Sequence, residues 1–169
     1  MDKRQRVIEK AKTKPAYLKL LNFTIANTIP FNKPHGFRIA NLGDYHIQTT
    51  LPYKRKNMNH LRGIHACALA TLCEFTTGAL LIFNLDAKKY RIILESLEVK
   101  YHYQCKTAAT ARYEINDDWL QNTVIQPLEN KPAVFVPCPI ELYDTQNNLV
   151  CSATVNWQIK DWQKVRTKV

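Results

Sequence analysis

The hydrophobic and polar positions of residues 3–29 follow the period of a helix. Four apolar residues recur at steps of three and four and would share one face: Leu18, Leu21, Ile25 and Ile29. Pro15 is expected to break this stretch, and Pro30 and Pro34 to end it, because proline lacks the N–H that continues a helix. The pattern predicts a helical segment at the N-terminus.

The period then changes to two. GFRIAN (36–41) and YHIQTTLPY (45–53) alternate in character on either side of Leu42-Gly43-Asp44. Glycine suits the tight turn between them. These residues predict a β-hairpin.

The longest apolar run, IHACALATLCEFTTGALLIF at 64–83, is hydrophobic on almost every side of a helix. Such a helix has to be wrapped by other elements. Its length also matches a membrane span. However, Glu74 lies near its centre, where a carboxylate would cost roughly 2.5–3.5 kcal/mol in a bilayer. We therefore expect the core helix of a soluble protein and no membrane partner.

The remaining apolar positions alternate with polar ones in four segments, each of which predicts a strand: LEVKYHYQC, TAATARYEI, AVFVPCPIELYD and LVCSATVNWQIKDW. The last two are joined by TQNN, a favourable turn composition. Pro137 and Pro139 favour an edge strand or a bulge. Residues 117–132 are compatible with a short helix or with a long connection.

The element order is therefore a helix, two strands, one long apolar helix and about four strands. Antiparallel strands that curl around the central helix would bury it, in an α+β architecture. No repeat or linker divides the chain. We expect a single domain at 1–169, with the helical segment 1–30 packed on it.

Composition excludes several classes of function. The 4 glycines are too far apart for a phosphate-binding loop or a dinucleotide-binding fingerprint. The 5 cysteines form no CxxC pair, which indicates free thiols in a reducing cytoplasm. The N-terminus lacks the apolar core of a secretory signal, so we expect a cytoplasmic location. Histidines and cysteines do not cluster as ligands, so no metal site is expected.

The net charge of +10 is concentrated at 1–19, at KRK 54–56 with Arg62, and in the C-terminal tail. A basic surface attracts nucleic acid, acidic carrier proteins or a phosphorylated cofactor such as coenzyme A. The terminal charges can also serve only to keep the protein in solution. A nucleic-acid partner is not expected, because no recognisable binding motif accompanies the charge.

The stretch NHLRGIHACALATLCEFTTG (59–78) resembles a motif of the hot-dog fold acyl-CoA thioesterases of the phenylacetic-acid-pathway type. In that family an Asn, then a Gly, then His-Gly-Gly open the central helix, and an acidic residue follows the His by nine residues. Four residues fall in those places: Asn59, Gly63, His65 and Glu74. Ala66 and Cys67 replace the two glycines. The stretch is still more similar to a branch of the superfamily known as a domain of unknown function, where His-Ala is ordinary.

The resemblance implies a hot-dog fold, in which an antiparallel sheet wraps the central helix. It also implies self-association to a dimer or tetramer, with sites at the subunit interface. Nine residues turn a helix by about 900°, so His65 and Glu74 would point to opposite sides. Either His65 precedes the helix proper, or the site combines residues of two chains.

Hydrolysis of acyl thioesters is the activity that the resemblance implies. The reaction needs an activated water or a carboxylate nucleophile, and donors for the developing oxyanion. Glu74 is the candidate base or nucleophile, and His65 and Asn59 would orient the carbonyl or the water. The N–H groups of Ala66 and Cys67 are candidate oxyanion donors. Four further residues are candidates for substrate binding: Thr71, Thr77, Arg55 and Arg62.

Each assignment has a structural alternative. Glu74 can pair with a cation across a dimer, His65 can be structural, and Asn59 can cap a turn. The two arginines can be solvated loop charges. The expected substrate is an acyl-CoA or an acyl carrier protein, with coenzyme A as part of the substrate and no separate cofactor. The alternative function is a non-catalytic hot-dog module that binds acyl or aryl ligands or only assembles, because fold alone does not fix function.

Overall fold

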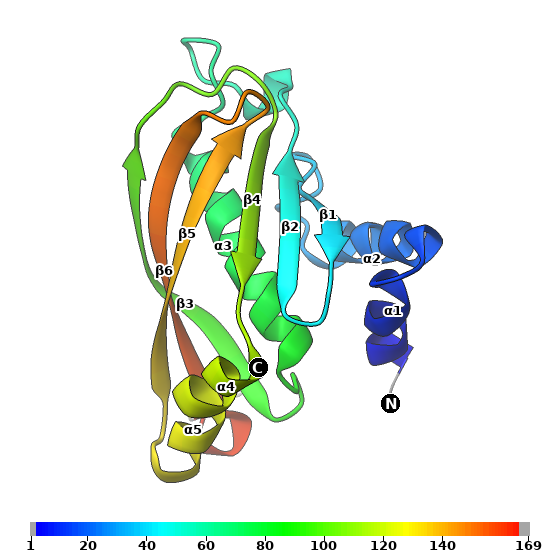
Figure 1. Ribbon diagram of the computed structural model, residues 1–169, viewed down its shortest axis with the longest axis vertical. Helices are drawn as coiled ribbons and strands as arrows, with labels where there is room; N and C mark the ends of the chain where they lie inside the picture. The colour runs from blue at the N-terminus through cyan, green and yellow to red at the C-terminus, as the bar shows by residue number, and fades with distance from the viewer. Residues whose placement is uncertain (1–2, 166–169) are drawn as a thin grey trace.

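The computed structural model describes residues 3–165, and in it an antiparallel sheet curves around one long helix, α3 (Ala66–Asn84; Figure 1). The strands have the spatial order β1-β2-β4-β5-β6-β3. Their bounds are β1 Arg38–Leu42, β2 His46–Leu51, β3 Tyr90–Tyr101, β4 Ala109–Glu114, β5 Val134–Asp144 and β6 Leu149–Asp161. The other α-helices are α1 (Lys3–Ala11), α2 (Pro15–Thr28), α4 (Asp117–Leu120) and α5 (Gln126–Asn130). The predicted α+β hot-dog fold is confirmed; the end of the basic C-terminal tail, 166–169, lies outside the described residues.

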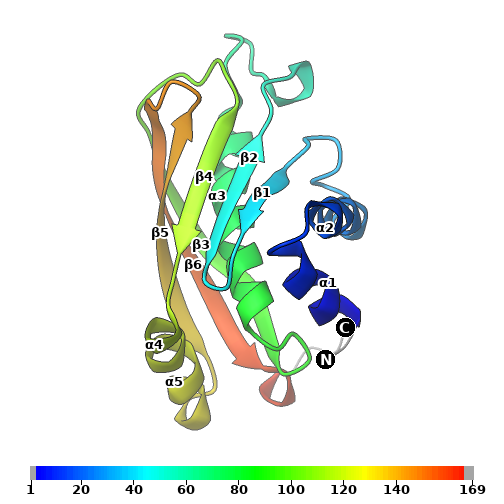
Figure 2. The ribbon, with the colours of Figure 1, turned by 45° about the vertical axis from the view of Figure 1, so that its right-hand side comes forward.

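The two N-terminal helices lie beside β1, at one edge of the sheet (Figure 2). The helical stretch breaks before Pro15, as predicted, and Pro15 opens α2. Leu21 of the predicted apolar stripe is buried, and Leu18 and Ile25 are half-buried. Ile29 lies just beyond the last helical residue and is exposed.

Asn22 of α2 covers the outer edge of β1. Its Oδ1 accepts a hydrogen bond from the Ile39 N–H at 2.7 Å, and its Nδ2 donates to the Ile39 carbonyl at 2.9 Å. A bare strand edge is a template for pairing with another chain. Asn22 blocks that edge, whereas β3, at the other end of the sheet, has no strand on its outer side within residues 3–165.

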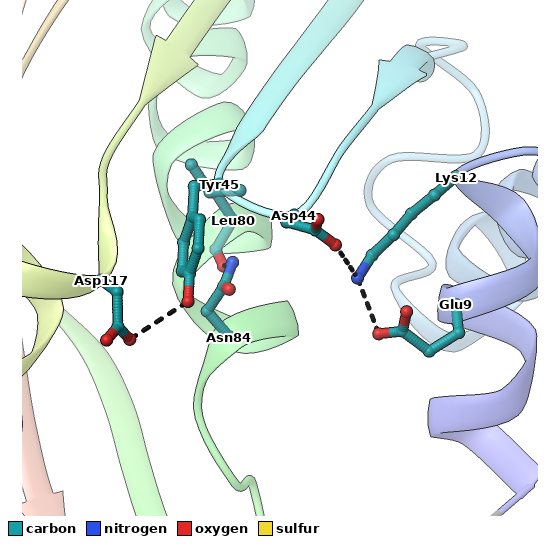
Figure 3. A network of polar contacts seen from close by, with 7 residues as sticks. All are labelled: Glu9, Lys12, Asp44, Tyr45, Leu80, Asn84 and Asp117. Carbon is teal, nitrogen blue, oxygen red and sulfur yellow. Dashed lines mark hydrogen bonds and ion pairs between the residues drawn. The ribbon is translucent and has the colours of Figure 1, made fainter.

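A network of polar contacts fastens α1 to the turn of the first hairpin (Figure 3). Lys12 Nζ lies 2.7 Å from a carboxylate oxygen of Glu9 and 2.8 Å from one of Asp44. Tyr45, the next residue of that turn, donates its hydroxyl to Asp117 at the start of α4. Exposed ion pairs contribute only about 0–1 kcal/mol each. They orient α1 more than they stabilise it.

β5 departs from the sequence prediction. It lies between β4 and β6, so the expectation of an edge strand at Pro137 and Pro139 is wrong, and the nearby bulge falls between Leu142 and Tyr143 instead. β4 nevertheless pairs with β5 only at 142–144, whereas β6 pairs with it along 134–143. The two prolines lie where β5 has no partner on the β4 side, so their missing N–H groups cost no ladder hydrogen bond.

β3 starts earlier than the sequence predicted, whereas residues 117–130 take the helical form, one of the two alternatives for that segment. β3 begins at Tyr90 rather than at residue 97, and it ends at Tyr101. Residues 117–130 are helical, with a π-helical turn (Gln121–Ile125) between α4 and α5. Asn116 caps this segment by accepting the Trp119 N–H.

α3 is the wrapped core helix. It is long and apolar enough to cross a bilayer by length and composition alone. In the fold, however, Leu69, Leu72 and Leu80 are buried. Its contacts extend to β2, β3, β4, β5 and β6.

Gly78 is a point of close approach between α3 and β6. A Cβ at Gly78 would lie 2.6 Å from Trp157 Cζ2, so a side chain there would collide with the indole ring. Beside it, Thr77 Oγ1 accepts a hydrogen bond from Trp157 Nε1 at 3.0 Å. The missing Cβ and the hydroxyl together let Trp157 pack on the helix with its N–H satisfied.

We expect Gly78→Ala to lower the free energy of unfolding by about 1–3 kcal/mol, because an extra methyl overpacks this contact. The helix propensity of Ala alone would act in the opposite direction, by about 1 kcal/mol. Urea unfolding measures the difference. In a Trp157→Phe background, which lacks the colliding ring atoms, the same substitution should cost less. Stabilisation by Gly78→Ala in the native background would contradict the proposed contact.

Candidate functional site

His65 is the N-cap of α3. Its backbone is extended, and its Nδ1 accepts a hydrogen bond from the Cys67 N–H at 3.1 Å. The His65 N–H donates to the Asn57 carbonyl at 2.7 Å, which holds the residue against the preceding loop. His65 therefore precedes the helix proper, one of the two arrangements expected from its spacing to Glu74.

Asn59 organises the turn that leads into His65. Its Oδ1 accepts the N–H groups of Leu61 and Gly63, both at 3.0 Å, and its own N–H donates to the Gly63 carbonyl. Arg62 has a left-handed backbone (φ 59°) within this turn. The Asn59 amide oxygen is thus used to hold the turn. Asn59 lines a hollow together with Tyr101 and Cys105, whereas Cys67 lines a separate cavity.

A cavity of about 250 Å³ lies beside the first two turns of α3; we call it the helix-start cavity. It brings together three of the residues singled out in the sequence, His65, Cys67 and Thr71. Its other walls come from the loop after α2 and from the loop before α3. The residues that line it are Phe31, His35, Phe37, Lys56, Asn57, Met58, His65, Cys67, Ala68 and Thr71.

His35 and Asn57 of this cavity form a pair that sequence reasoning missed. Asn57 is 1% exposed, and its Nδ2 donates to the carbonyls of His35 (2.9 Å) and Pro52 (2.8 Å). Its Oδ1 must then accept from His35 Nδ1, 3.0 Å away, because an amide nitrogen offers only two donors. This contact places a proton on His35 Nδ1. No period or short motif links these two loops, so only the structure reveals the pair.

Glu74 lies on the same side of α3 as Cys67 and Thr71, because steps of four and three residues keep side chains on one stripe. It is half-buried, and within residues 3–165 no hydrogen bond or ion pair reaches its carboxylate. Burial raises the pKa of Glu74 above its ordinary value, because the charged form loses solvation. Glu74 is not among the residues that line the helix-start cavity of its own chain.

The two candidate oxyanion donors differ in this structure. The Cys67 N–H is taken by His65 Nδ1. The Ala66 N–H, in the first turn of the helix, has no acceptor within the described part of the chain. One backbone donor is therefore free, and the second becomes free only when the His65 ring turns away.

The four candidate substrate-binding residues separate in space. Thr71 lines the helix-start cavity, and its hydroxyl donates to the Cys67 carbonyl. Thr77 is fully buried with its hydroxyl engaged by Trp157, so the structure does not bring it to the cavity. Arg55 and Arg62 are exposed on the loop before α3. Lys56, next to Arg55, lines the cavity and makes its mouth positive.

The comparisons with known proteins concern family and fold. The family model for the domain of unknown function DUF4442 matches residues 19–159. Comparison with curated proteins gives no match.

Solved structures resemble this chain at low sequence identity. A Pseudomonas aeruginosa protein of unknown function, described as a probable thioesterase, has a TM-score of 0.78 and 19% identity, covering 85% of this chain and 95% of its own. A Haemophilus influenzae thioesterase has a TM-score of 0.68 and 16% identity, covering 89% and 94%. A Chlorobaculum tepidum protein of unknown function has a TM-score of 0.73 and 13% identity, covering 89% and 98%. At these identities the likeness establishes the fold.

The raised pKa of Glu74 predicts how its replacement changes stability. The folded chain binds the Glu74 proton more tightly than the unfolded chain, so its contribution to stability falls as pH rises through the raised pKa. Glu74→Gln removes this charge. We expect it to raise the free energy of unfolding at neutral pH, with the difference vanishing below about pH 4.

Urea unfolding at the two pH values measures this difference, with Glu129→Gln on exposed α5 as the matched control. A loss of stability at neutral pH would contradict the prediction. It would indicate that a cation from a second chain holds the carboxylate, because none within residues 3–165 does so.

Proposed function

The chain belongs to the DUF4442 family, and from its fold and the residues around the start of α3 we propose that it hydrolyses acyl thioesters. The observation that carries the proposal is Glu74, a half-buried carboxylate on the open stripe of the core helix that has no partner among residues 3–165. The thioesterase descriptions of two structural neighbours support the same reaction class.

Glu74 suits proton transfer for a physical reason. Desolvation moves its pKa upward, toward neutral pH, and a base is most effective when its pKa is close to the working pH. As general base, Glu74 takes a proton from water while the water oxygen bonds to the thioester carbonyl carbon. The carbon–sulfur bond then breaks, and the leaving thiolate takes up a proton. As nucleophile, Glu74 would instead bond to the carbonyl carbon and expel the thiolate, which takes up a proton, and water would then hydrolyse the resulting anhydride to the free acid and regenerate Glu74.

The start of α3 supplies the complementary charge. The Ala66 N–H and the positive end of the helix dipole stabilise the oxyanion, and the Cys67 N–H joins them when the His65 ring turns. His65 then orients the carbonyl or the water, and Asn59 shapes the turn from which His65 extends. Thr71 contacts the acyl group, while Arg55, Lys56 and Arg62 attract the phosphates of coenzyme A or an acidic acyl carrier protein.

The arrangement requires two chains. Glu74 follows Cys67 by seven residues, which is about 10 Å along a helix, too far for both to act on one carbonyl group. Antiparallel pairing of β3 with β3 of a second copy would join the two sheets and set the two α3 helices antiparallel. The helix start of one chain would then approach the middle of the other. The open edge of β3, against the covered edge of β1, supports this pairing.

A non-catalytic module that binds acyl or aryl ligands is the second candidate function. The hydrogen bond from the Cys67 N–H to His65 Nδ1 favours it, because an occupied donor cannot stabilise an oxyanion. In that case the helix-start cavity would bind an acyl group without hydrolysing its thioester.

The test of catalysis is thiol release from a panel of acyl-CoA substrates. We expect Glu74→Gln to lower kcat/KM by at least about 10²-fold, because the base or nucleophile is removed. Glu129→Gln, the exposed control, should leave turnover unchanged. Turnover that survives in Glu74→Gln would remove Glu74 from the mechanism, whereas saturable binding of acyl-CoA without turnover by the native chain would favour the binding module.

The two-chain site can be tested by introducing a charged residue on the open edge strand, β3. Ile93 of β3 is 42% exposed and lies on the strand that would pair with the second copy. We expect Ile93→Asp to weaken dimerisation by at least about tenfold in sedimentation analysis, and activity should fall with the dimer. Phe135→Asp, an exposed residue of β5, is the matched control. An active monomer would contradict the shared site.

A further inference from the structure

The α2 helix is apolar on both sides, although the fold buries only one of them. Leu21 faces inward, while Leu20 and Phe23 are 44% and 69% exposed. At 100° per residue, Ala16, Leu20, Phe23 and Asn27 share one solvent-facing stripe, which we call the α2 outer face. Two more exposed apolar side chains, Ile29 and Phe31, follow directly after the helix.

Lysines surround the α2 outer face. Lys14 immediately precedes the helix, and Lys19 flanks the stripe on one side. On the other flank, Lys10 of α1 lies 4.9 Å from the centre of the Tyr17 ring. At the far end, Lys33 Nζ donates to Asn27 Oδ1, so the loop after α2 folds back against the stripe. No Asp or Glu occurs between Glu9 and Asp44, so no acidic side chain in that span offsets these charges.

Exposed Phe and Leu side chains ringed by lysines are the pattern of a helix that lies in the interface of a membrane. The apolar side chains enter the boundary between headgroups and acyl chains, and each nearby lysine is attracted to anionic lipid. Isolated exposed apolar residues would need no explanation. Here two phenylalanines, a leucine and an isoleucine fall within residues 20–31, beside the most one-sided charge of the chain.

We propose that the α2 outer face docks on the surface of an anionic phospholipid bilayer. The chain lies on the membrane and does not span it, because α3 remains the wrapped core helix. Attraction by the lysines brings the protein to the surface, and insertion of Phe23 and its neighbours holds it there. The proposal does not depend on thioester hydrolysis.

The test is flotation of the native chain with vesicles of equal parts phosphatidylcholine and phosphatidylglycerol. We expect binding to these vesicles, weakened by added salt, and little binding to pure phosphatidylcholine. Phe23→Ser should weaken binding by about tenfold. Phe135→Ser, which removes an equally exposed phenylalanine of the sheet, should leave binding unchanged.

Lys19→Glu provides a second variant that leaves the apolar side chains in place, and it should weaken binding by at least about fivefold. Absence of native binding to anionic vesicles, or equal losses in Phe23→Ser and Phe135→Ser, would overturn the proposal. So would a change of oligomeric state in Phe23→Ser, which would identify the face as a contact with a second copy. Binding to an acidic protein such as polyglutamate but not to vesicles would assign the face to an acidic partner instead.

Discussion

α3 has to hide apolar side chains around most of its circumference, while a single sheet can enclose it from one side only. Where α3 contacts the sheet, its side chains are buried: Leu72 and Leu80 are fully buried, and Trp157 packs where Gly78 leaves space. Burial of such side chains stabilises the fold by about 1.5–3 kcal/mol each. The stripe that the sheet leaves open in the first half of α3 carries Cys67, Thr71 and Glu74. A desolvated carboxylate without a partner in residues 3–165 opposes folding of the single chain, so helix stability does not account for Glu74, whereas the proposed catalytic role in a two-chain site does.

The two edges of the sheet differ, and this difference supports the proposed dimer. At β1, Asn22 satisfies both polar groups of the Ile39 peptide and excludes another strand. At β3, twelve residues of extended backbone have no neighbour on the outer side in the described chain. A second copy that pairs there extends the sheet and covers the open stripe of α3 in the same step. The proposed dimer would thus bury the open stripe of α3 and would also supply the second half of the proposed site.

Alternation predicted the strands that bury one clear face, and a long apolar run predicted the helix that is buried on most sides. The α3 helix, the first hairpin and β6 all fall where their patterns place them. The beginning of β3 was missed because Ile92, Ile93 and Leu94 are consecutive apolar residues, and a bulge between Leu94 and Ser96 breaks the alternation. Pro137 and Pro139 were misinterpreted because sequence shows which residues lack a donor, but not where two neighbouring strands diverge.

The residues of the candidate site also fall into those that the sequence identified correctly and those that it missed or misassigned. His65 was found through the motif that the chain resembles, and Cys67 and Thr71 follow it in the first two turns of α3, where spacing determines direction. Thr77 was a substrate-binding candidate by analogy with the family that the chain resembles, yet its hydroxyl is engaged by Trp157, eighty residues away. His35 and Asn57 come from two irregular loops, and their pairing depends on the path of the backbone between Gly36 and the start of α3.

Phe31 connects the two proposals physically. It is 60% exposed at the end of the apolar run that begins on the α2 outer face, and it also forms a wall of the helix-start cavity. A chain that lies on a bilayer through that face would hold the cavity next to the lipid interface, where amphiphilic acyl thioesters concentrate because burial of each methylene is favourable. Lys56 on the opposite wall would face the phosphate-bearing end of such a molecule. Contact of Phe31 with both the proposed membrane surface and the cavity would account for an exposed aromatic residue at a position where the fold itself gains little from burying it.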